Sequence, residues 1–400
     1  MTHDRPGSPL TVLSVDADAL RAQRRALWSL RWERTQRVAA RVLARPDVSI
    51  FGCYDAGNVG DLALGVATAG IAGRLARTAF DSPRSSQRLT PPRAAILAGG
   101  GVVTARPGSP LAAFSSYVGK RPCAVAVIGV SSTVEPGELS PASLATLREA
   151  AWLSTRSQAS ADSLAAILGR DDIVVQPDIA FALKLSGQGF QPPPRRARCL
   201  ALNVSPFLHS RVGTRFVAHR SPSAWFAKHL PDQAAWYEQI GPRYVELVRA
   251  LLGRFLQAGW RVRSIPLAPE DDLFARSVLS GLAVEHQPYE SDPLKVMAHF
   301  AAAERALVTR FHAHVFALLT GTPLGSFAYS PKCNHLMSEL GLPRRAQAEP
   351  RDWVHELEDT CERLAGDTSV ASLEPAAMSA LEAKAYDLTR RGVLAVLDRA

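Results

Sequence analysis

The segment VTRFHAHVFALLTGTPLGSFAYSPKCNHLMSELGL (308–342) carries the clearest fold signal in the chain. An apolar strand ends at Arg310, a helix begins near His312, and a second apolar run (323–329) precedes another helical pattern. Short apolar strands that alternate with helices are typical of βαβ units, in which the strands run parallel. The segment therefore predicts part of a parallel α/β sheet.

The same alternation extends over most of the sequence. Apolar runs occupy 48–54, 94–100, 123–130 and 172–178 in the first half, and 199–206, 261–268, 306–310 and 323–329 in the second. Between the halves, SGQGFQPPPRRAR (186–198) is rich in glycine, proline and arginine, which is typical of a linker. We therefore expect an α/β fold with two doubly wound, Rossmann-like lobes facing a cleft (GT-B-like), over 48–190 and 199–345.

Both ends of the chain are expected to be helical, as an N-terminal arm over 1–47 and C-terminal helices over 346–400. In the arm, arginines interleave with Trp28 and Trp32 without a clean amphipathic pattern. A packed or fraying arm is the simpler interpretation. Peripheral attachment to a membrane through the basic and tryptophan residues is the alternative.

The amino-acid composition and net charge narrow the classes of molecule that the chain could bind. Its 400 residues are 47% hydrophobic and 21% charged, as in ordinary globular proteins. The net charge of +9 favours an anionic partner, which could be nucleic acid, an anionic membrane face or a phosphorylated substrate. The sequence has no long lysine and arginine run and no aromatic pattern of a single-strand-binding surface, so we do not expect a nucleic acid partner.

Cysteine usage and hydropathy bear on the compartment. The five cysteines, at 53, 123, 199, 333 and 361, are far apart, odd in number and without a C-x-x-C pair, which favours a reducing compartment. The first ten residues contain no apolar leader-type run, and no stretch reaches the ~18–20 apolar residues of a membrane span. We expect a cytoplasmic protein, with peripheral association at the inner face of the membrane as an option.

Polar residues at the predicted strand ends could carry chemistry, because ligands bind outside the carboxyl ends of parallel strands. His312 lies where a helix begins after one strand, and Lys332 lies just past the next strand. A lone histidine there is often only a structural contact, but two polar residues converging on one rim favour a functional site. A metal pair of His312 and His314 is not expected, because residues two apart on a helix point to different sides.

The first half offers a second set of such residues. Asn58, Gly60 and Asp61 lie between a strand and a helix, where backbone amides can face an anion or a sugar, although Asp61 could simply cap the helix. The triple glycine Gly99–Gly101 (Gly99, Gly100 and Gly101) ends another strand and could line the cleft. The G-x-G-x-x-G fingerprint is absent, which argues against a nicotinamide enzyme.

These motifs together resemble a known family. R-F-H-A-H (310–314), followed by G-T-P and Y-S-P-K, closely resembles the C-terminal signature of the polysaccharide pyruvyl transferases. Four further hallmarks occur in order: G-C-Y-D-A-G-N-V-G-D (52–61), Gly99–Gly101, S-T-R-S-Q-A-S (154–160) and Pro177–Asp178. Each motif alone is weak, but five in the right order are specific.

The resemblance implies an enzyme that moves the enolpyruvyl group of phosphoenolpyruvate onto a saccharide or lipid-linked saccharide. The group closes into a cyclic ketal and phosphate is released, with no metal or redox cofactor. Arg156, Arg310 and Lys332 are then expected to bind the donor's charges, and His312 to be the general acid. Asn58, Gly60, Asp61 and the triple glycine are expected at the acceptor side.

The chain departs from the family pattern at two places, and two other functions stay open. Ser157 replaces a frequent aspartate, and Leu62 replaces an acidic residue, so the acceptor pocket or the packing could differ. One alternative is a GT-B-type glycosyltransferase that uses a nucleotide sugar, since fold does not fix function. The other is a non-catalytic saccharide-binding family member. Donor competition and turnover distinguish them.

Overall fold

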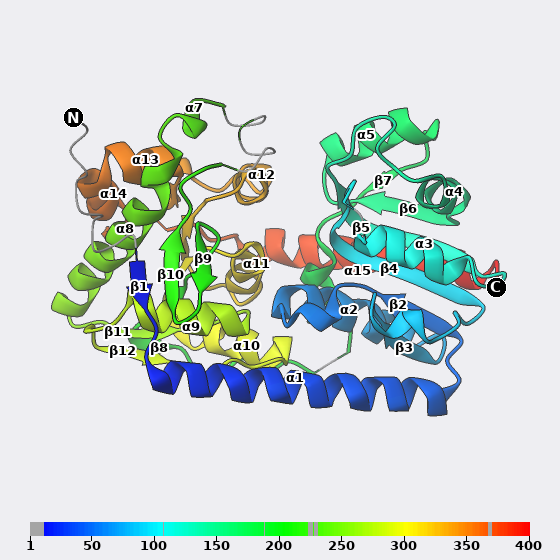
Figure 1. Ribbon diagram of the computed structural model, residues 1–400, viewed down its shortest axis with the longest axis horizontal. Helices are drawn as coiled ribbons and strands as arrows, with labels where there is room; N and C mark the ends of the chain where they lie inside the picture. The colour runs from blue at the N-terminus through cyan, green and yellow to red at the C-terminus, as the bar shows by residue number, and fades with distance from the viewer. Residues whose placement is uncertain (1–11, 107, 188, 223–226, 228–230, 367–369) are drawn as a thin grey trace. The chain divides into compact units, whose positions relative to one another are not determined.

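The computed structural model describes residues 12–106, 108–187, 189–222, 227, 231–366 and 370–400 (Figure 1). They form two compact units. The N-terminal unit comprises residues 28–190, 291–293 and 375–400. The C-terminal unit comprises the described residues of 1–27, 191–290 and 294–374. Each unit is built on its own six-stranded sheet.

The sheet of the N-terminal unit is entirely parallel and has the order β3-β2-β4-β5-β6-β7. Its strands are β2 (Val48–Phe51), β3 (Thr78–Asp81), β4 (Ala94–Val103), β5 (Ala124–Ser132), β6 (Trp152–Thr155) and β7 (Val174–Val175). The strand that follows β2 in the sequence, β3, pairs with one edge of β2, and the next strand, β4, pairs with its other edge. The strand order therefore reverses between β2 and β4, which is a topological switch point.

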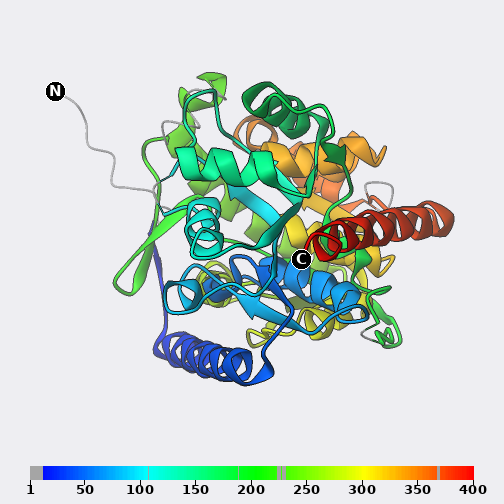
Figure 2. The ribbon, with the colours of Figure 1, turned by 90° about the vertical axis from the view of Figure 1, so that its right-hand side faces the viewer.

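Helices cover both faces of this sheet. Apolar residues of α3 (Pro110–Val118), α4 (Pro141–Glu149) and α5 (Gln158–Leu168) share one core cluster with β2, β4, β5 and β6. The other face contacts α2 (Val59–Ala72) and α15 (Pro375–Leu397), which lie beside each other in Figure 2. Three of these helices start at a serine, Ser109, Ser140 or Ser157, whose side chain accepts a first-turn N–H.

Residues 346–400, expected to be C-terminal helices, are divided between the two units. They contain α13 and α14, which belong to the C-terminal unit, and α15, which belongs to the N-terminal unit. The close approach of α15 depends on Gly392. A Cβ placed on Gly392 would lie 2.7 Å from Ile128 Cδ1 on β5 and 2.8 Å from Trp152 Cδ1 on β6. A glycine thus lets the last helix lie directly on the first sheet.

The sheet of the C-terminal unit is also parallel, with the order β12-β11-β8-β13-β14-β15. Its strands are β8 (Arg196–Asn203), β11 (Arg261–Ser264), β12 (Val284–His286), β13 (Ala303–Val308), β14 (Leu324–Phe327) and β15 (Gln347–Ala348). Because β8 is followed by β11 on one side and by β13 on the other, the switch point lies between β8 and β13.

The remaining elements of this unit surround that sheet. A small antiparallel sheet has the order β1-β10-β9, formed by Val12–Ser14, Arg215–Ala218 and His209–Val212. The helices are α7 (Pro231–Ala234), α8 (Tyr237–Gln257), α9 (Pro269–Val278), α10 (Pro293–Ala301), α11 (Phe311–Leu319), α12 (Pro331–Glu339), α13 (Pro350–His355) and α14 (Leu357–Ala365).

An aromatic cluster fixes the end of β13. The ring of Tyr244, on α8, lies 5.9 Å from that of Phe327 and 5.8 Å from that of Trp353. Its hydroxyl group is 2.7 Å from Thr309 Oγ1, directly after β13. The core therefore holds the strand end from which α11 starts.

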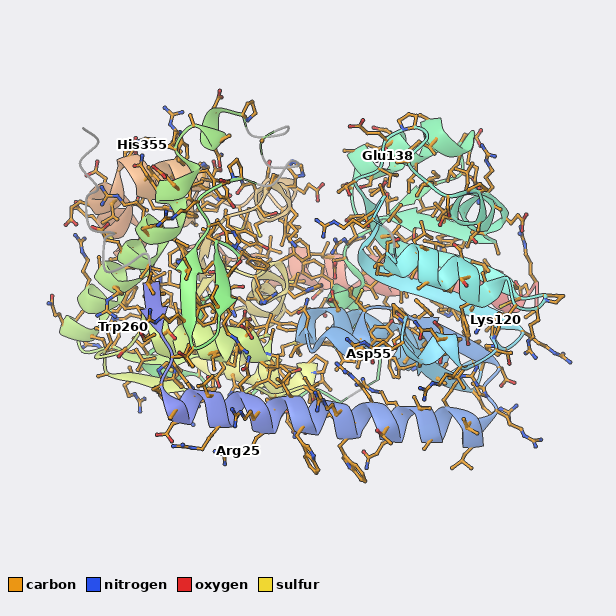
Figure 3. All side chains as sticks on the ribbon, viewed as in Figure 1. Arg25, Asp55, Lys120, Glu138, Trp260 and His355 are labelled. Carbon is orange, nitrogen blue, oxygen red and sulfur yellow. The ribbon has the colours of Figure 1, made fainter. Side chains whose placement is uncertain are left out.

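The predicted N-terminal arm contains β1 and the long helix α1 (Ala17–Ala44), while residues 1–11 lie outside the described residues. Trp28 and Trp32 are exposed, and their rings stack with centroids 6.4 Å apart. Arg25 projects from the same helix (Figure 3). In the described part of the chain, no helix combines the length and apolarity that crossing a membrane requires.

Replacing Gly392 by alanine should lower the free energy of unfolding by about 1–3 kcal/mol, the usual cost of an overpacked core. The added methyl group would have to displace Ile128 and Trp152. Gly253→Ala in α8 is the matched control, because a Cβ there meets nothing within 4 Å. Alanine's better helix propensity should leave that variant unchanged or slightly more stable. Equal thermal midpoints for both variants would contradict the close packing of α15.

Candidate functional site

At the switch point of the N-terminal unit, the loop after β2 carries the predicted residues Asn58, Gly60 and Asp61. Asn58 is the N-cap of α2, and its Oδ1 accepts a hydrogen bond of 3.1 Å from the Gly60 amide. Its Nδ2 donates to Asp61 Oδ2 at 2.9 Å. Asn58 is thus the residue that caps the helix, and the Asp61 carboxylate is held in place beside it.

The triple glycine lies near the carboxyl end of the neighbouring strand β4, before Val102 and Val103. Gly99 and Gly100 have φ angles of 66° and 88°, in the left-handed region that favours glycine. A Cβ on Gly99 would lie 2.8 Å from Leu64 Cδ1, and one on Gly100 would lie 3.9 Å from Asp61 Oδ1. The structure therefore brings the triple glycine and Asp61 together at the carboxyl edge of the sheet. Gly101 is exposed there.

Arg156 follows β6 on the same edge. Its Nε donates to Ser131 Oγ at 2.9 Å, and its Nη1 donates to Asp178 Oδ2 at 2.6 Å. The side chains of Arg156 and Asp178 are 10% and 2% exposed. The ion pair joins two motifs that are separate in the sequence, S-T-R-S-Q-A-S and Pro177–Asp178. It fixes the plane of the guanidinium group.

The departure at Ser157 has a local explanation. Ser157 is the N-cap of α5, and its hydroxyl group accepts a hydrogen bond from the Ser160 amide at 3.3 Å. Aspartate is an equally good N-cap residue, so the aspartate frequent in the family could start this helix in the same way. The exchange therefore preserves the start of α5.

At the switch point of the C-terminal unit, Asn203 and Arg310 connect two neighbouring strands. Asn203 ends β8, and its Oδ1 accepts a hydrogen bond of 3.0 Å from the Arg310 amide after β13. Its Nδ2 donates to the Ile265 carbonyl after β11, also at 3.0 Å. One buried amide side chain thus ties together the carboxyl ends of three adjacent strands.

The guanidinium group of Arg310 is held by a buried carboxylate. Its Nε donates to Asp271 Oδ2 at 2.5 Å and its Nη2 to Oδ1 at 2.7 Å, and Asp271 is fully buried. Arg310 also lies over the ring of Phe207, 4.7 Å from its centroid. Phe207 stacks in turn on Tyr329, with ring centroids 4.1 Å apart.

Asn203, Asp271 and Phe207 were not identified from the sequence. Phe207 and Asp271 follow the predicted runs 199–206 and 261–268, and this position is the signal that could have indicated them, whereas Asn203 lies inside the first of these runs. The pairing of Asn203 and Asp271 with Arg310 could not be inferred, because the partners are 107 and 39 residues away.

His312 and His314 have different surroundings, although both lie in α11. His312 is in the first turn, is 7% exposed and packs its ring at 88° to that of Phe311. His314 is fully buried, with Nδ1 2.8 Å from the Arg310 carbonyl and Nε2 2.6 Å from Ser326 Oγ. The carbonyl can only accept, so Nδ1 carries the proton and Nε2 accepts from the serine. His314 is a structural residue of the helix start.

Lys332 lies in the first turn of α12, after the neighbouring strand β14, and is exposed. The N-cap Ser330 makes no side-chain capping hydrogen bond. A cation at the positive end of a helix is unfavourable by itself, and the two together favour an anion. The charge of Lys332 also helps to lower the pKa of His314, after the larger effect of burial.

The carboxyl edges of the two sheets carry similar chemical groups. Each carries a guanidinium group oriented by a buried carboxylate, Arg156 by Asp178 and Arg310 by Asp271. The C-terminal edge adds an imidazole and an ammonium group, which suits binding an anion and transferring a proton. Across the described ranges, no group of three or more His, Cys, Asp or Glu residues is placed to hold a metal ion.

The fold and these residues define a two-unit α/β protein with polar side chains at the carboxyl edge of each doubly wound sheet. A family model for polysaccharide pyruvyl transferases matches residues 58–331, which is more than half of the chain. The chain belongs to the polysaccharide pyruvyl transferase family. The match includes every predicted site residue except Lys332, which lies one position beyond it.

Comparisons with individual proteins are more distant. No curated protein matches the chain. A UDP-GlcNAc 2-epimerase from Methanocaldococcus jannaschii is 10% identical, over 81% of this chain and 94% of that one, with a TM-score of 0.45. The E. coli heptosyltransferase WaaC with ADP is 14% identical, over 76% and 92% of the two chains, with a TM-score of 0.36. The family assignment rests on the sequence match.

His314 should make stability depend on pH. Burial lowers its pKa to about 4 from the ordinary value of 6.5, so between these values the unfolded chain binds a proton that the folded chain does not. The contribution of neutral His314 to the free energy of unfolding should be fully present above pH 6.5. It should fall, by up to about 3 kcal/mol, as the pH approaches 4.

Urea denaturation across this range, on wild type and His314→Gln, measures the effect. The variant should show a shallower loss of stability toward pH 4, because its side chain does not titrate. His335→Gln, at an exposed position of α12, is the control and should follow the wild type. Parallel curves for wild type and His314→Gln would show that the pKa of His314 is not lowered by folding.

Proposed function

We propose that this chain transfers the enolpyruvyl group of phosphoenolpyruvate to a saccharide, closes it into a cyclic ketal and releases phosphate. The observation that carries the proposal is the position of the family's motif residues. They stand at the carboxyl edges of both doubly wound sheets, where ligands of such sheets bind. The reaction as proposed uses no metal or redox cofactor.

The donor's negative charges account for the cations. Phosphoenolpyruvate carries a phosphate and a carboxylate, and we assign their binding to Arg156, Arg310 and Lys332. Both guanidinium groups are already held by buried aspartates, so little side-chain entropy is lost when an anion binds. Lys332 contributes a flexible point charge at the start of α12.

The chemical step requires a proton donor, which we assign to His312. A proton moves from the imidazole to the methylene carbon of the donor, which becomes a methyl group, and the adjacent carbon becomes electrophilic. One sugar hydroxyl group adds to that carbon, and its proton returns to the imidazole. A second hydroxyl group then displaces phosphate, its proton leaves with the phosphate, and the ketal ring closes. Imidazole suits this role because it exchanges protons near neutral pH.

The acceptor is assigned to the N-terminal edge. The Asp61 carboxylate and the Asn58 amide are polar groups that can bind sugar hydroxyl groups, and their mutual hydrogen bond of 2.9 Å orients them. Gly60 and the triple glycine Gly99–Gly101 leave space for a ligand to approach the backbone.

The direct test is incubation of the purified protein with phosphoenolpyruvate and candidate saccharides. We expect phosphate release and a product heavier by one pyruvyl ketal, detected by mass spectrometry. Parallel reactions contain UDP-sugars or ADP-sugars instead of phosphoenolpyruvate. Sugar transfer from a nucleotide donor would refute the proposal and support a glycosyltransferase. Failure of phosphoenolpyruvate to bind would support a non-catalytic role.

Arg156→Ala and Lys332→Ala should each weaken phosphoenolpyruvate binding by about 1.5–3 kcal/mol, the range of charge-assisted hydrogen bonds. Calorimetric titration of the folded protein measures this. Arg156→Lys should not restore affinity, because lysine cannot reproduce the planar fork that bonds to Ser131 and Asp178. Wild-type affinity in Arg156→Lys would show that a point charge is sufficient at this position.

His312→Ala should reduce turnover by about 10²–10⁴-fold while donor affinity is largely kept, because an acid acts mainly in the transition state. His335→Ala is the matched control at an exposed position of the next helix, and its rate should be normal. Turnover, donor affinity and thermal midpoint are measured on the same preparations. A folded His312→Ala protein with a near-normal rate would remove this histidine from the mechanism.

A further inference from the structure

An arginine-lined pocket lies within the N-terminal unit, on the other side of β2 from the triple glycine. It has a volume of about 330 Å³ and lies beside the ends of β2 and β3. Its lining includes four arginines and two aspartates: Arg34, Arg37, Arg84, Arg88, Asp55 and Asp81. Its size suits a small ligand such as a monosaccharide with one charged group.

The pocket has an excess of positive charge. Arg34 Nε lies 3.6 Å from Asp55 Oδ1, on the loop after β2 (Figure 3). Among the described residues, neither Arg84 nor Arg88 has a carboxylate partner. Burial lowers the pKa of Arg34, and the neighbouring charges of Arg84 and Arg37 lower it further, against the effect of Asp55. Such clustered cations favour binding of an anion.

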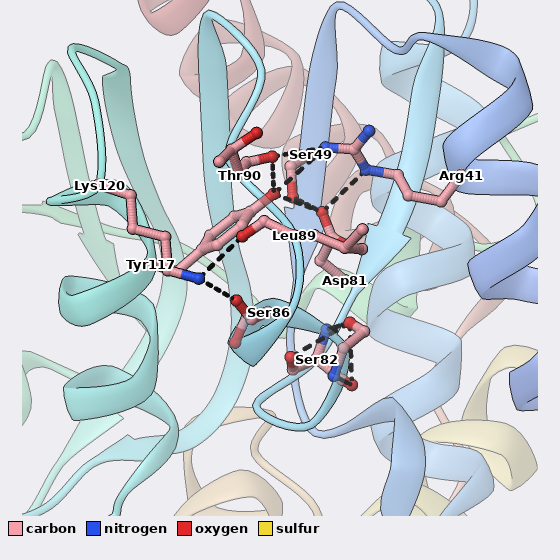
Figure 4. A network of polar contacts seen from close by, with 10 residues as sticks. Arg41, Ser49, Asp81, Ser82, Ser86, Leu89, Thr90, Tyr117 and Lys120 are labelled. Atoms are coloured by element: carbon pink, nitrogen blue, oxygen red, sulfur yellow. Dashed lines mark hydrogen bonds and ion pairs between the residues drawn. The ribbon is translucent and has the colours of Figure 1, made fainter.

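The second aspartate is held rigidly. Asp81 Oδ2 accepts hydrogen bonds from Ser49 Oγ at 2.6 Å, from the Tyr117 hydroxyl group at 2.7 Å and from Arg41 Nε at 3.2 Å (Figure 4). Asp81 is 1% exposed. Arg41 neutralises this carboxylate from outside the pocket lining, so Asp81 offsets little of the pocket's own positive charge.

Several buried polar atoms of the lining lack a hydrogen bond. They are Arg34 Nε, Arg37 Nη2, Tyr54 Oη and Asp81 Oδ1. Tyr54 and Asp81 are both more than nine-tenths buried. These atoms have almost no accessible surface, so a ligand in the pocket would meet the exposed guanidinium groups of Arg84 and Arg88 and the half-buried one of Arg37. Guanidinium N–H groups are suited to phosphate oxygens.

We propose that this pocket binds the phosphate group of a phosphorylated saccharide, on Arg37, Arg84 and Arg88. The inference rests on the proposed function, and it names the acceptor class as a saccharide that carries a phosphate or diphosphate. Tyr54 and Asn58 belong to one short loop, which places the pocket next to the acceptor residues.

Titration calorimetry on the full-length protein tests the pocket without requiring turnover. Glucose 1-phosphate should bind, whereas glucose should bind far more weakly. Arg84→Gln combined with Arg88→Gln should weaken glucose 1-phosphate binding at least about tenfold, since two charge-assisted contacts are lost. Both arginines are exposed, so the variant should fold normally. Arg390→Gln, an exposed position on α15, is the matched control and should bind as the wild type does.

Phosphoenolpyruvate is titrated into the same variants, because it also carries a phosphate. The double variant should keep its affinity for phosphoenolpyruvate, and Arg156→Ala should keep its affinity for glucose 1-phosphate. Equal loss of both ligands in the double variant would make the pocket part of the donor site and overturn the inference. So would glucose 1-phosphate binding that does not depend on Arg84 and Arg88, or no binding by the wild type.

The same titration separates the two sources of such a phosphate. A synthetic lipid-linked hexose diphosphate in detergent is compared with free glucose 1-phosphate. Tighter binding of the lipid form, lost in the double variant, assigns a lipid-linked acceptor, whereas equal binding assigns a free sugar phosphate. Glucose 1-phosphate binding that depends on Arg84 and Arg88 would support the pocket even if no ketal were formed. Failure of the pocket proposal can therefore be distinguished from failure of the proposed reaction.

Discussion

The ion pair between Arg310 and Asp271 is the interaction on which the C-terminal edge depends. Asp271 is fully buried, and a buried carboxylate without a partner would cost several kcal/mol, roughly 3–5 when one member of such a pair is removed. Arg310 is also the N-cap residue of α11, and its amide is bound by Asn203. Fixing this residue therefore fixes the start of the helix that carries His312. The Arg156 and Asp178 pair has the same role on the other sheet.

These ion pairs explain why the family motifs contain residues that are far apart in the sequence. The aspartate of the Pro177–Asp178 motif orients the arginine of the middle motif. Gly99 in β4 allows Leu64 of α2 to approach, and Asp61 lies in the first turn of the same helix. Each motif supplies one part of an edge, and the parallel sheet brings the parts together. Conserving the chemistry then requires the supporting residues as well as the reacting ones.

The sequence predicted the fold class because apolar runs and helical patterns alternate with little interruption, and the longer strands β4, β5 and β8 follow the predicted runs. The short strands β3, β6 and β12 were not predicted, because their segments TAFD, WLST and VEH are not apolar runs, whereas the equally short β2 and β14 lie inside longer apolar runs. The site residues that directly follow predicted strands were identifiable. Asn203 and Asp271 were missed because their importance lies in contacts with a distant part of the chain. The place of α15 was likewise set by packing at Gly392, which no local pattern encodes.

We propose that an acid on the protein protonates the methylene carbon of phosphoenolpyruvate before the ketal forms. The most direct measurement is the isotopic content of the product methyl group after reaction in heavy water, by mass spectrometry and proton NMR. Exchangeable protons on the acid would then be deuterium, so each ketal methyl group should contain one deuterium. One phosphate should be released for each ketal that forms. A ketal whose methyl group contains only protium would contradict it.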